Sequence, residues 1–130
     1  MIGEELKART RKFALDVIRL CLQLGDDDLA RLVRPQLLRA GSGVASNYRA
    51  TRRARSTREF ISRLGVVIEE ADEAELWLDV LETLKHSPVD QVISLRREAA
   101  ELLAIFSASR RTAQQNARAR RPSSQEPDRR

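Results

Sequence analysis

This sequence of 130 residues is poor in the residue types that form crosslinks, metal sites and catalytic sites. Its single cysteine, Cys21, cannot form a disulfide within the chain, and together with the single histidine, His86, it is too little for a zinc cluster. One histidine and one cysteine also supply no nucleophile with a matching base. We therefore expect a protein that is not an enzyme, holds no metal and needs no cofactor.

Aromatic residues (4%), glycine (5) and proline (4) are scarce as well, which argues against a β-sandwich or barrel with its frequent turns. The longest stretch without charge, residues 40–48, is far shorter than the roughly 20 apolar residues that a membrane-spanning helix needs. Charged side chains begin at Glu4, and no apolar signal segment follows them. We expect a soluble, cytoplasmic protein that does not enter a membrane.

Charged residues (33%) and hydrophobic residues (42%) dominate instead, a composition typical of helical bundles. Apolar residues recur every three or four positions in four segments, approximately 4–24, 29–53, 57–86 and 88–112. Amphipathic helices joined by short connections predict an all-α protein, an antiparallel up-down four-helix bundle of residues 1–112. Beyond Thr112 the apolar pattern fades, so residues 113–130 are expected to form a disordered, arginine-rich tail.

Local signals mark where some of these helices begin and bend. Because proline disfavours the helical conformation of the residue before it, the second helix either begins near Pro35 or kinks there. Gly41 and Gly43 each cost a helix about 1 kcal/mol relative to alanine, which close approach of another helix would explain. Ser56 and Glu59 match a capping box at the start of the third helix. Ser87-Pro88 is expected to supply the N-cap and the first residue of the fourth.

The net charge of +5 hides a strong asymmetry along the chain. Residues 31–63 carry a net charge of +8, residues 69–90 carry −7, and residues 110–130 carry +5. The basic cluster around the second connection consists of Arg39, Arg49, Arg52, Arg53, Arg55 and Arg58. These arginines either bind phosphate groups or pair with the acidic third helix, within the subunit or across an interface. Aromatic residues do not alternate with them, so stacking on single-stranded bases is not expected.

Other candidate positions have structural interpretations. Asn47 either forms a buried hydrogen bond that sets helix register or contributes to a polar site inside the bundle, and we favour the structural role. Glu75 and Glu82 lie near the apolar stripe of the third helix, but the sequence has no Glu-x-x-His motif of a di-iron bundle. We expect them to pair with arginines of another helix.

Three of the four helices carry apolar residues outside the stripe that one bundle core requires. Either a wide face of each helix is buried in the bundle core, or a second apolar surface mediates self-association. The third helix has Trp77 on its flank, with Leu76 and Val80 beside it. A large aromatic residue at such a position is typical of an interface anchor, so these three residues are the predicted oligomer interface.

The segment 37–50, LLRAGSGVASNYRA, resembles the second helix of the bacterial four-helix-bundle proteins called 23S rRNA intervening-sequence proteins. The resemblance continues through RARS at 53–56, EFI at 59–61, EEADE at 69–73 and WL at 77–78, and it covers about residues 6–106. It implies a long bundle that assembles as a cyclic homopentamer without enzymatic activity. A related branch of that family comprises accessory proteins of diversity-generating retroelements, which bind nucleic acid and a reverse transcriptase. Gly43 and the arginine-rich tail depart from the family pattern.

The sequence therefore predicts a non-catalytic homo-oligomer, pentameric by resemblance, that binds RNA or another nucleic acid through a basic surface. The alternative is a protein-interaction scaffold without a nucleic-acid role, whose arginines form ion pairs between subunits.

Overall fold

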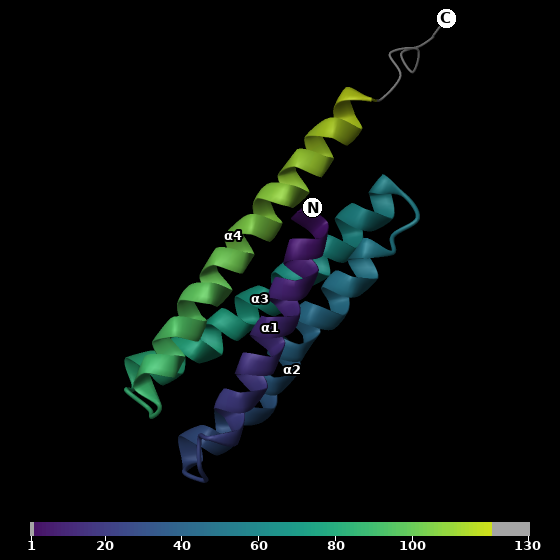
Figure 1. Cartoon of the computed structure of the whole chain (residues 1–130). Helices are drawn as coiled ribbons and strands as arrows, with labels where there is room; N and C mark the ends of the chain where they lie inside the picture. The colour runs from purple at the N-terminus through teal and green to yellow at the C-terminus, as the bar shows by residue number, and fades with distance from the viewer. Residues whose placement is uncertain (1, 121–130) are drawn as a thin grey trace, which may run out of the picture.

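The computed structural model describes residues 2–120 and consists of four helices in an antiparallel bundle, as the sequence predicted. Helix α1 spans Ile2–Leu22, α2 spans Asp28–Arg52, α3 spans Thr57–Thr83 and α4 spans Val89–Ala119. Each helix packs along the next, whereas α1 and α4 contact each other much less. Figure 1 shows α4 extending well past the point where α1 begins. Among the described residues, none of these helices combines the length and apolarity needed to cross a bilayer.

The apolar stripes predicted from the sequence meet in one core. All four helices contribute, and the largest fully buried side chains include Phe13, Leu37, Leu78, Leu102 and Phe106. On α3 the regular stripe is buried from Leu64 to Leu81. The rings of Tyr48 and Phe106 stack with their centroids 5.6 Å apart. Burial raises the pKa of the Cys21 thiol to about 11, so this side chain stays protonated at neutral pH and acts as a small apolar residue.

The turn between α1 and α2 follows the local sequence signals. Gly25 has a φ of +81°, a left-handed conformation that glycine adopts at little cost. Asp27 caps α2, and its carboxylate accepts a hydrogen bond from the Ala30 N–H at 2.7 Å. That hydrogen bond, followed by one from His86, lowers the pKa of Asp27. Since His86 Nε2 lies 2.8 Å from Asp27 Oδ2, the first and third connections are joined at one end of the bundle.

Pro35 lies inside α2, so of the two alternatives for this helix a start near Pro35 is wrong, and the helix spans nearly the whole of the predicted segment 29–53. The turns before the proline are held by the Asp27 cap and by Ala30 and Val33, which are fully buried. Pro35 itself is exposed, and the carbonyl group that loses its helical partner can be hydrated. Apolar burial therefore outweighs the unfavourable local preference.

Helix α3 ends at Thr83, three residues before the expected boundary, because the chain closes a Schellman motif there. The N–H of His86 donates to Leu81 O at 2.9 Å and that of Lys85 to Glu82 O at 3.0 Å, with Lys85 at a φ of 55°. The start of α4 also differs from the prediction: Pro88 is extended (ψ 114°) and takes the N-cap position in place of Ser87.

Helix α4 continues to Ala119, past the predicted bundle boundary at Thr112. Residues 113–119, AQQNARA, are mostly good helix formers, so propagation of an existing helix costs little even without an apolar stripe. Residues 113–119, which were predicted to belong to a disordered tail, are therefore helical. The remaining part of the predicted tail, residues 121–130, lies outside the residues that the structure describes.

The two glycines of α2 have different neighbours. A Cβ atom at Gly41 would lie 2.7 Å from Val17 Cγ1 of α1, so this glycine allows the two helices to approach closely. A Cβ atom at Gly43 would lie 2.9 Å from Glu70 Cδ, the far end of a flexible side chain of α3. Close helix approach thus explains Gly41, whereas Gly43 leaves room for a carboxylate.

Because the two glycines have different neighbours, replacing each of them with alanine should change the stability of the protein by different amounts. Gly41→Ala should lower the free energy of unfolding by about 1–2 kcal/mol, because overpacking outweighs the gain in helix propensity. Gly43→Ala should stay within about 0.5 kcal/mol of the wild type, since the Glu70 carboxylate can rotate toward water while propensity improves. Urea denaturation of both variants tests this, and equal midpoints would contradict the assigned difference.

Candidate nucleic-acid interface

The turn that joins α2 to α3 is fixed by hydrogen bonds at both helix ends. At the end of α2 the N–H of Arg53 donates to Ala50 O at 3.1 Å. At the start of α3 the Ser56 hydroxyl accepts from the Glu59 N–H at 3.0 Å. Glu59 Oε1 in turn accepts from the Arg55 N–H at 2.9 Å, one residue before the donor of a regular capping box. The side chains on this turn therefore project from a well-supported backbone.

Glu59 is the one acidic residue among the nine arginines of residues 31–63. The backbone hydrogen bond from Arg55 and the side-chain bond from Arg63, at 2.8 Å, lower the pKa of its carboxyl group. Its Oε1 also lies 3.7 Å from the Arg55 guanidinium. One carboxylate with three such contacts cannot neutralise the turn.

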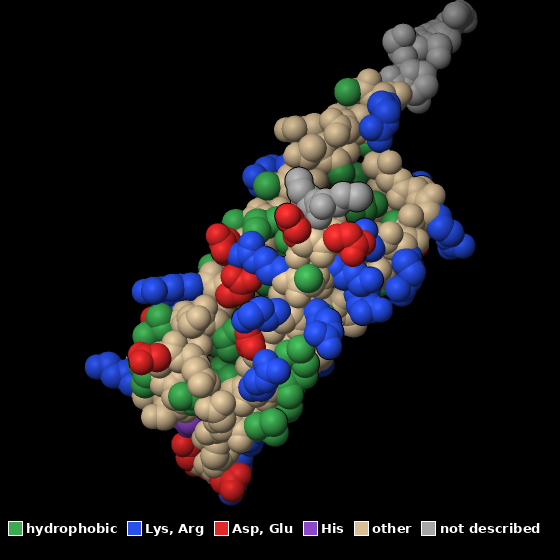
Figure 2. Space-filling model, in the orientation of Figure 1, with side chains coloured by type: hydrophobic (Ala, Val, Ile, Leu, Met, Phe, Trp, Pro, Cys, Tyr) green, Lys and Arg blue, Asp and Glu red, His purple; other side chains and the backbone are tan. Residues whose placement is uncertain are grey.

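Four arginines form the exposed charge of this end, and we call them the tip arginines: Arg49, Arg53, Arg55 and Arg58. The Arg55 side chain is 90% exposed. For the other three, no ion pair is found within residues 2–120. Figure 2 shows basic side chains along the α2 edge of the molecule up to this turn.

The other two predicted arginines have partners inside the subunit. Arg39 lies 2.5 Å from Glu73 Oε2 and 3.7 Å from Glu70 Oε1, joining α2 to α3. Arg52 donates to Gly3 O at 2.6 Å and to Glu4 Oε2 at 3.0 Å, joining α2 to the start of α1. These contacts give both side chains a role in packing rather than in a free basic surface.

The acidic segment of α3 therefore does little to neutralise the tip within the subunit. Within residues 2–120, the acidic segment of α3 forms ion pairs with one of the six predicted arginines, Arg39. Further along α3, Glu82 pairs with Arg96 of α4, so the expected pairing with another helix holds for this glutamate. The hydrogen bond that Arg96 donates to the Glu82 carboxylate also raises the pKa of Arg96.

Within residues 2–120, Asn47 hydrogen-bonds to its own helix and to no other. Its side-chain amide donates to Gly43 O at 2.9 Å. Across from Gly43, Glu70 Oε1 is buried without a hydrogen-bond partner among the described residues. Burial raises the pKa of this carboxyl group, while Arg39 has the opposite effect.

The predicted interface residues differ in exposure. Leu76 is 52% exposed, whereas Trp77 and Val80 are half-buried and pack against the core of their own subunit. The Trp77 indole N–H donates to Glu73 Oε2 at 3.4 Å. Together, the three residues form an apolar ridge on α3, of which Leu76 is the most accessible part.

The arginines at the end of α4 were not among the predicted site residues, because most of that segment was expected to be a disordered tail. Arg120 donates to the Thr57 hydroxyl at 3.2 Å, at the very start of α3. Arg110 lies over Gly65, since a Cβ atom there would be 3.3 Å from Arg110 Nη2. Uninterrupted helix formers after Thr112 were the signal that could have identified this part of the helix.

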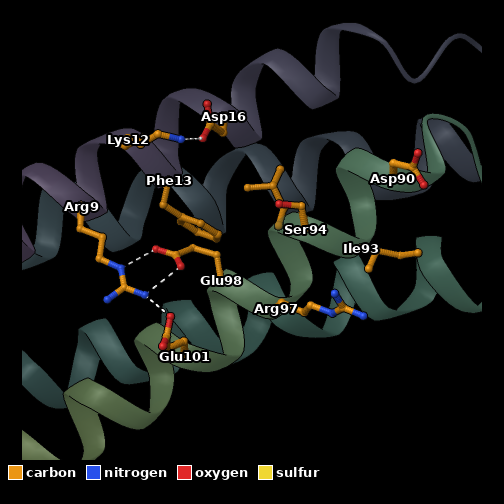
Figure 3. A pocket seen from close by; sticks show the side chains of 11 residues that line it. Arg9, Lys12, Phe13, Asp16, Asp90, Ile93, Ser94, Arg97, Glu98 and Glu101 are labelled. Atoms are coloured by element: carbon orange, nitrogen blue, oxygen red, sulfur yellow. Dashed lines mark hydrogen bonds and ion pairs between the residues drawn. The ribbon is translucent and has the colours of Figure 1, made fainter.

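A cleft of about 880 Å³ lies between α1 and α4, which contact each other less than the other neighbouring helices do. Figure 3 shows the Phe13 ring directed between the helices, with Arg9 bridging to Glu98 and Glu101. Arg9 Nε lies 2.7 Å from Glu98 Oε2, and this hydrogen bond raises the pKa of Arg9. Three basic and four acidic side chains line this cleft, so it lacks the excess positive charge of the tip.

The fold and the site define a small antiparallel helical bundle. Its basic end is the turn between α2 and α3, which is capped by hydrogen bonds. The family model described as 23S rRNA-intervening sequence protein matches residues 5–108. The chain belongs to this family.

A solved structure with the same fold is the crystal structure of a protein of unknown function of the S23 ribosomal protein family from Bacteroides thetaiotaomicron VPI-5482. Its sequence is 23% identical, the match covers 85% of this chain and 99% of that chain, and the TM-score is 0.74. At this identity the similarity establishes the fold. Among curated proteins, no match was found.

Proposed function

We propose that the protein is a non-catalytic homo-oligomer that binds RNA, or another nucleic acid, through the tip arginines. The observation that carries this proposal is a set of exposed guanidinium groups on a capped turn, served by a single nearby carboxylate. Guanidinium groups bind phosphate oxygens and release condensed counterions. The family description, which refers to an insertion in ribosomal RNA, is consistent with an RNA ligand.

The chemistry of the tip favours contact with the sugar–phosphate backbone over contact with bases. The turn residues between the arginines, Ala54, Ser56 and Thr57, are small or polar. The nearest aromatic residues in the sequence are Tyr48, which is buried, and Phe60, which is partly buried against the core. Without a stacking platform the protein should bind with little sequence preference.

Self-association is the second part of the proposal. The apolar ridge of Leu76, Trp77 and Val80 supplies a contact surface on α3. When one surface of a subunit binds a different surface of the next subunit, the assembly closes into a ring if the rotation between neighbouring subunits divides evenly into a full turn. The homopentamer implied by the family resemblance is such a ring. A ring repeats the tip arginines in every subunit, so that weak phosphate contacts act together.

The proposal is tested on the wild-type protein with an RNA duplex titrated at several salt concentrations. Four phosphate contacts at about −0.9 each predict a slope of log K against log salt of roughly −3 to −4 per engaged subunit. Light scattering at micromolar concentration should give a mass several times that of the 14.8 kDa chain. Binding that is absent or insensitive to salt would refute the nucleic-acid part, and a monomer would refute the assembly.

A further inference from the structure

The last turns of α4 and the first turn of α3 enclose two adjoining clefts. One cleft, of about 450 Å³, is lined by Arg55, Ser56, Thr57, Asn116 and Arg120, among others. The other, of about 520 Å³, is lined by Thr57, Arg58, Ile61, Ala117 and Arg120. Thr57 and Arg120 line both clefts, and their hydrogen bond of 3.2 Å joins the two helices between them.

The charge in these clefts has one sign. Arg120 is shared, Arg55 lines the first cleft, and Arg58 lines the second. Within the described part of the chain, no acidic side chain lines either cleft. The first cleft also offers hydroxyl and amide groups from Ser56, Thr57 and Asn116, which can donate to an oxyanion. Such a set of donors suits a phosphate group.

Two further arginines of α4 lie outside the clefts. Arg111 and Arg118 are seven residues apart, so they lie on the same side of the helix about 10 Å from each other. Arg120 follows Arg111 by about two and a half helical turns, so it lies on the opposite side of the helix, toward Thr57 of α3. Arg111 and Arg118 accordingly line neither cleft.

We propose that the paired clefts are a phosphate clamp centred on Arg120, and that together with the tip arginines they hold a double-stranded nucleic acid by its backbone. This inference rests on the proposed function and specifies its ligand as duplex. A single strand would need exposed aromatic rings for stacking, and the aromatic residue in the clefts is Phe60, which packs against the core. The expected partner presents regularly spaced phosphates on a rigid duplex.

The test compares two double variants that carry the same change in charge, R58A/R120A for the clamp and R49A/R53A for the tip arginines that line neither cleft. A 20-base-pair RNA duplex and a single strand of equal length are the probes. We expect the clamp variant to bind the duplex about 50-fold more weakly at 0.1 M salt, with a slope reduced by about 2. The wild type should bind the duplex more tightly than the single strand.

R111A/R118A is the control for charge, because it carries the same change in charge as the clamp variant at exposed arginines that line neither cleft. It should retain binding within about threefold, and circular dichroism should show unchanged helicity in every variant. If the clamp variant binds as the wild type does while the tip variant is weakened, the clamp is refuted and the proposed function stands. If neither variant is weakened, both are refuted. A preference for the single strand refutes the duplex assignment.

Discussion

Replacing Arg49, Arg53 and Arg55 with alanine is expected to weaken binding to an RNA duplex by about two to three orders of magnitude at 0.1 M salt. Each lost phosphate contact removes about 0.9 from the slope of log K against log salt, so three contacts remove about 2.7. Because these side chains are exposed, stability should change little. Fluorescence anisotropy across a salt series measures both the affinity and the slope.

A matched control separates local contacts from the overall field of the protein. Arg11, Arg31 and Arg97 are exposed, and none of them forms an ion pair within the described chain. The variant R11A/R31A/R97A loses the same charge as the triple tip variant but should bind within about fivefold of the wild type. Equal weakening by both variants would mean that net charge, and not the tip, determines binding.

The triple tip variant also distinguishes the proposed function from the scaffold hypothesis. If the tip arginines bind phosphates, the variant should retain the assembly of the wild type. If they form ion pairs between subunits, the same variant should dissociate the oligomer. Light scattering on the samples used for binding therefore decides between the two functions.

The second large effect is expected from Leu76→Asp, which should dissociate the oligomer. A carboxylate placed at a buried apolar contact costs about 2–4 kcal/mol per interface, equivalent to a roughly 30- to 1000-fold loss of affinity between subunits. Leu76 is 52% exposed in the subunit, so the folded monomer should tolerate the substitution. Sedimentation velocity over a range of concentrations measures the dissociation, and circular dichroism checks the fold.

Leu22→Asp is the control for this experiment. Leu22 is 80% exposed at the end of α1 and lies outside the apolar ridge. Its substitution introduces the same charge and should leave the oligomer intact. An oligomer unchanged by Leu76→Asp would contradict the assignment of the ridge, whereas an oligomer that responds to Leu22→Asp would move the interface to α1.

Local features of the helices could be predicted because they depend on neighbouring residues. The Ser56–Glu59 pair acts within a few residues of chain, and Ser56 caps α3 as predicted. Helix ends were less accurate where a competing local motif or continued propensity decided them. The Schellman motif at Lys85 shortened α3, and the helix formers after Thr112 lengthened α4.

The candidate site was predictable only in part. The sequence indicated where arginines concentrate, but not that Arg39 would pair with Glu73 or that Arg52 would hold the start of α1. Arg120 was excluded from the bundle, although the structure brings it to Thr57, 63 residues away in the chain. Such pairings depend on the rotation and register of packed helices, which no local pattern specifies.

The sequence by itself determined the all-helical class, the buried stripe of each helix and the basic character of the second connection, because apolar period and charge are properties of contiguous segments. Only the tertiary structure decided which charges remain free at the tip and how α4 meets α3. Those outcomes depend on distances between residues far apart in the chain, which are set when the helices pack.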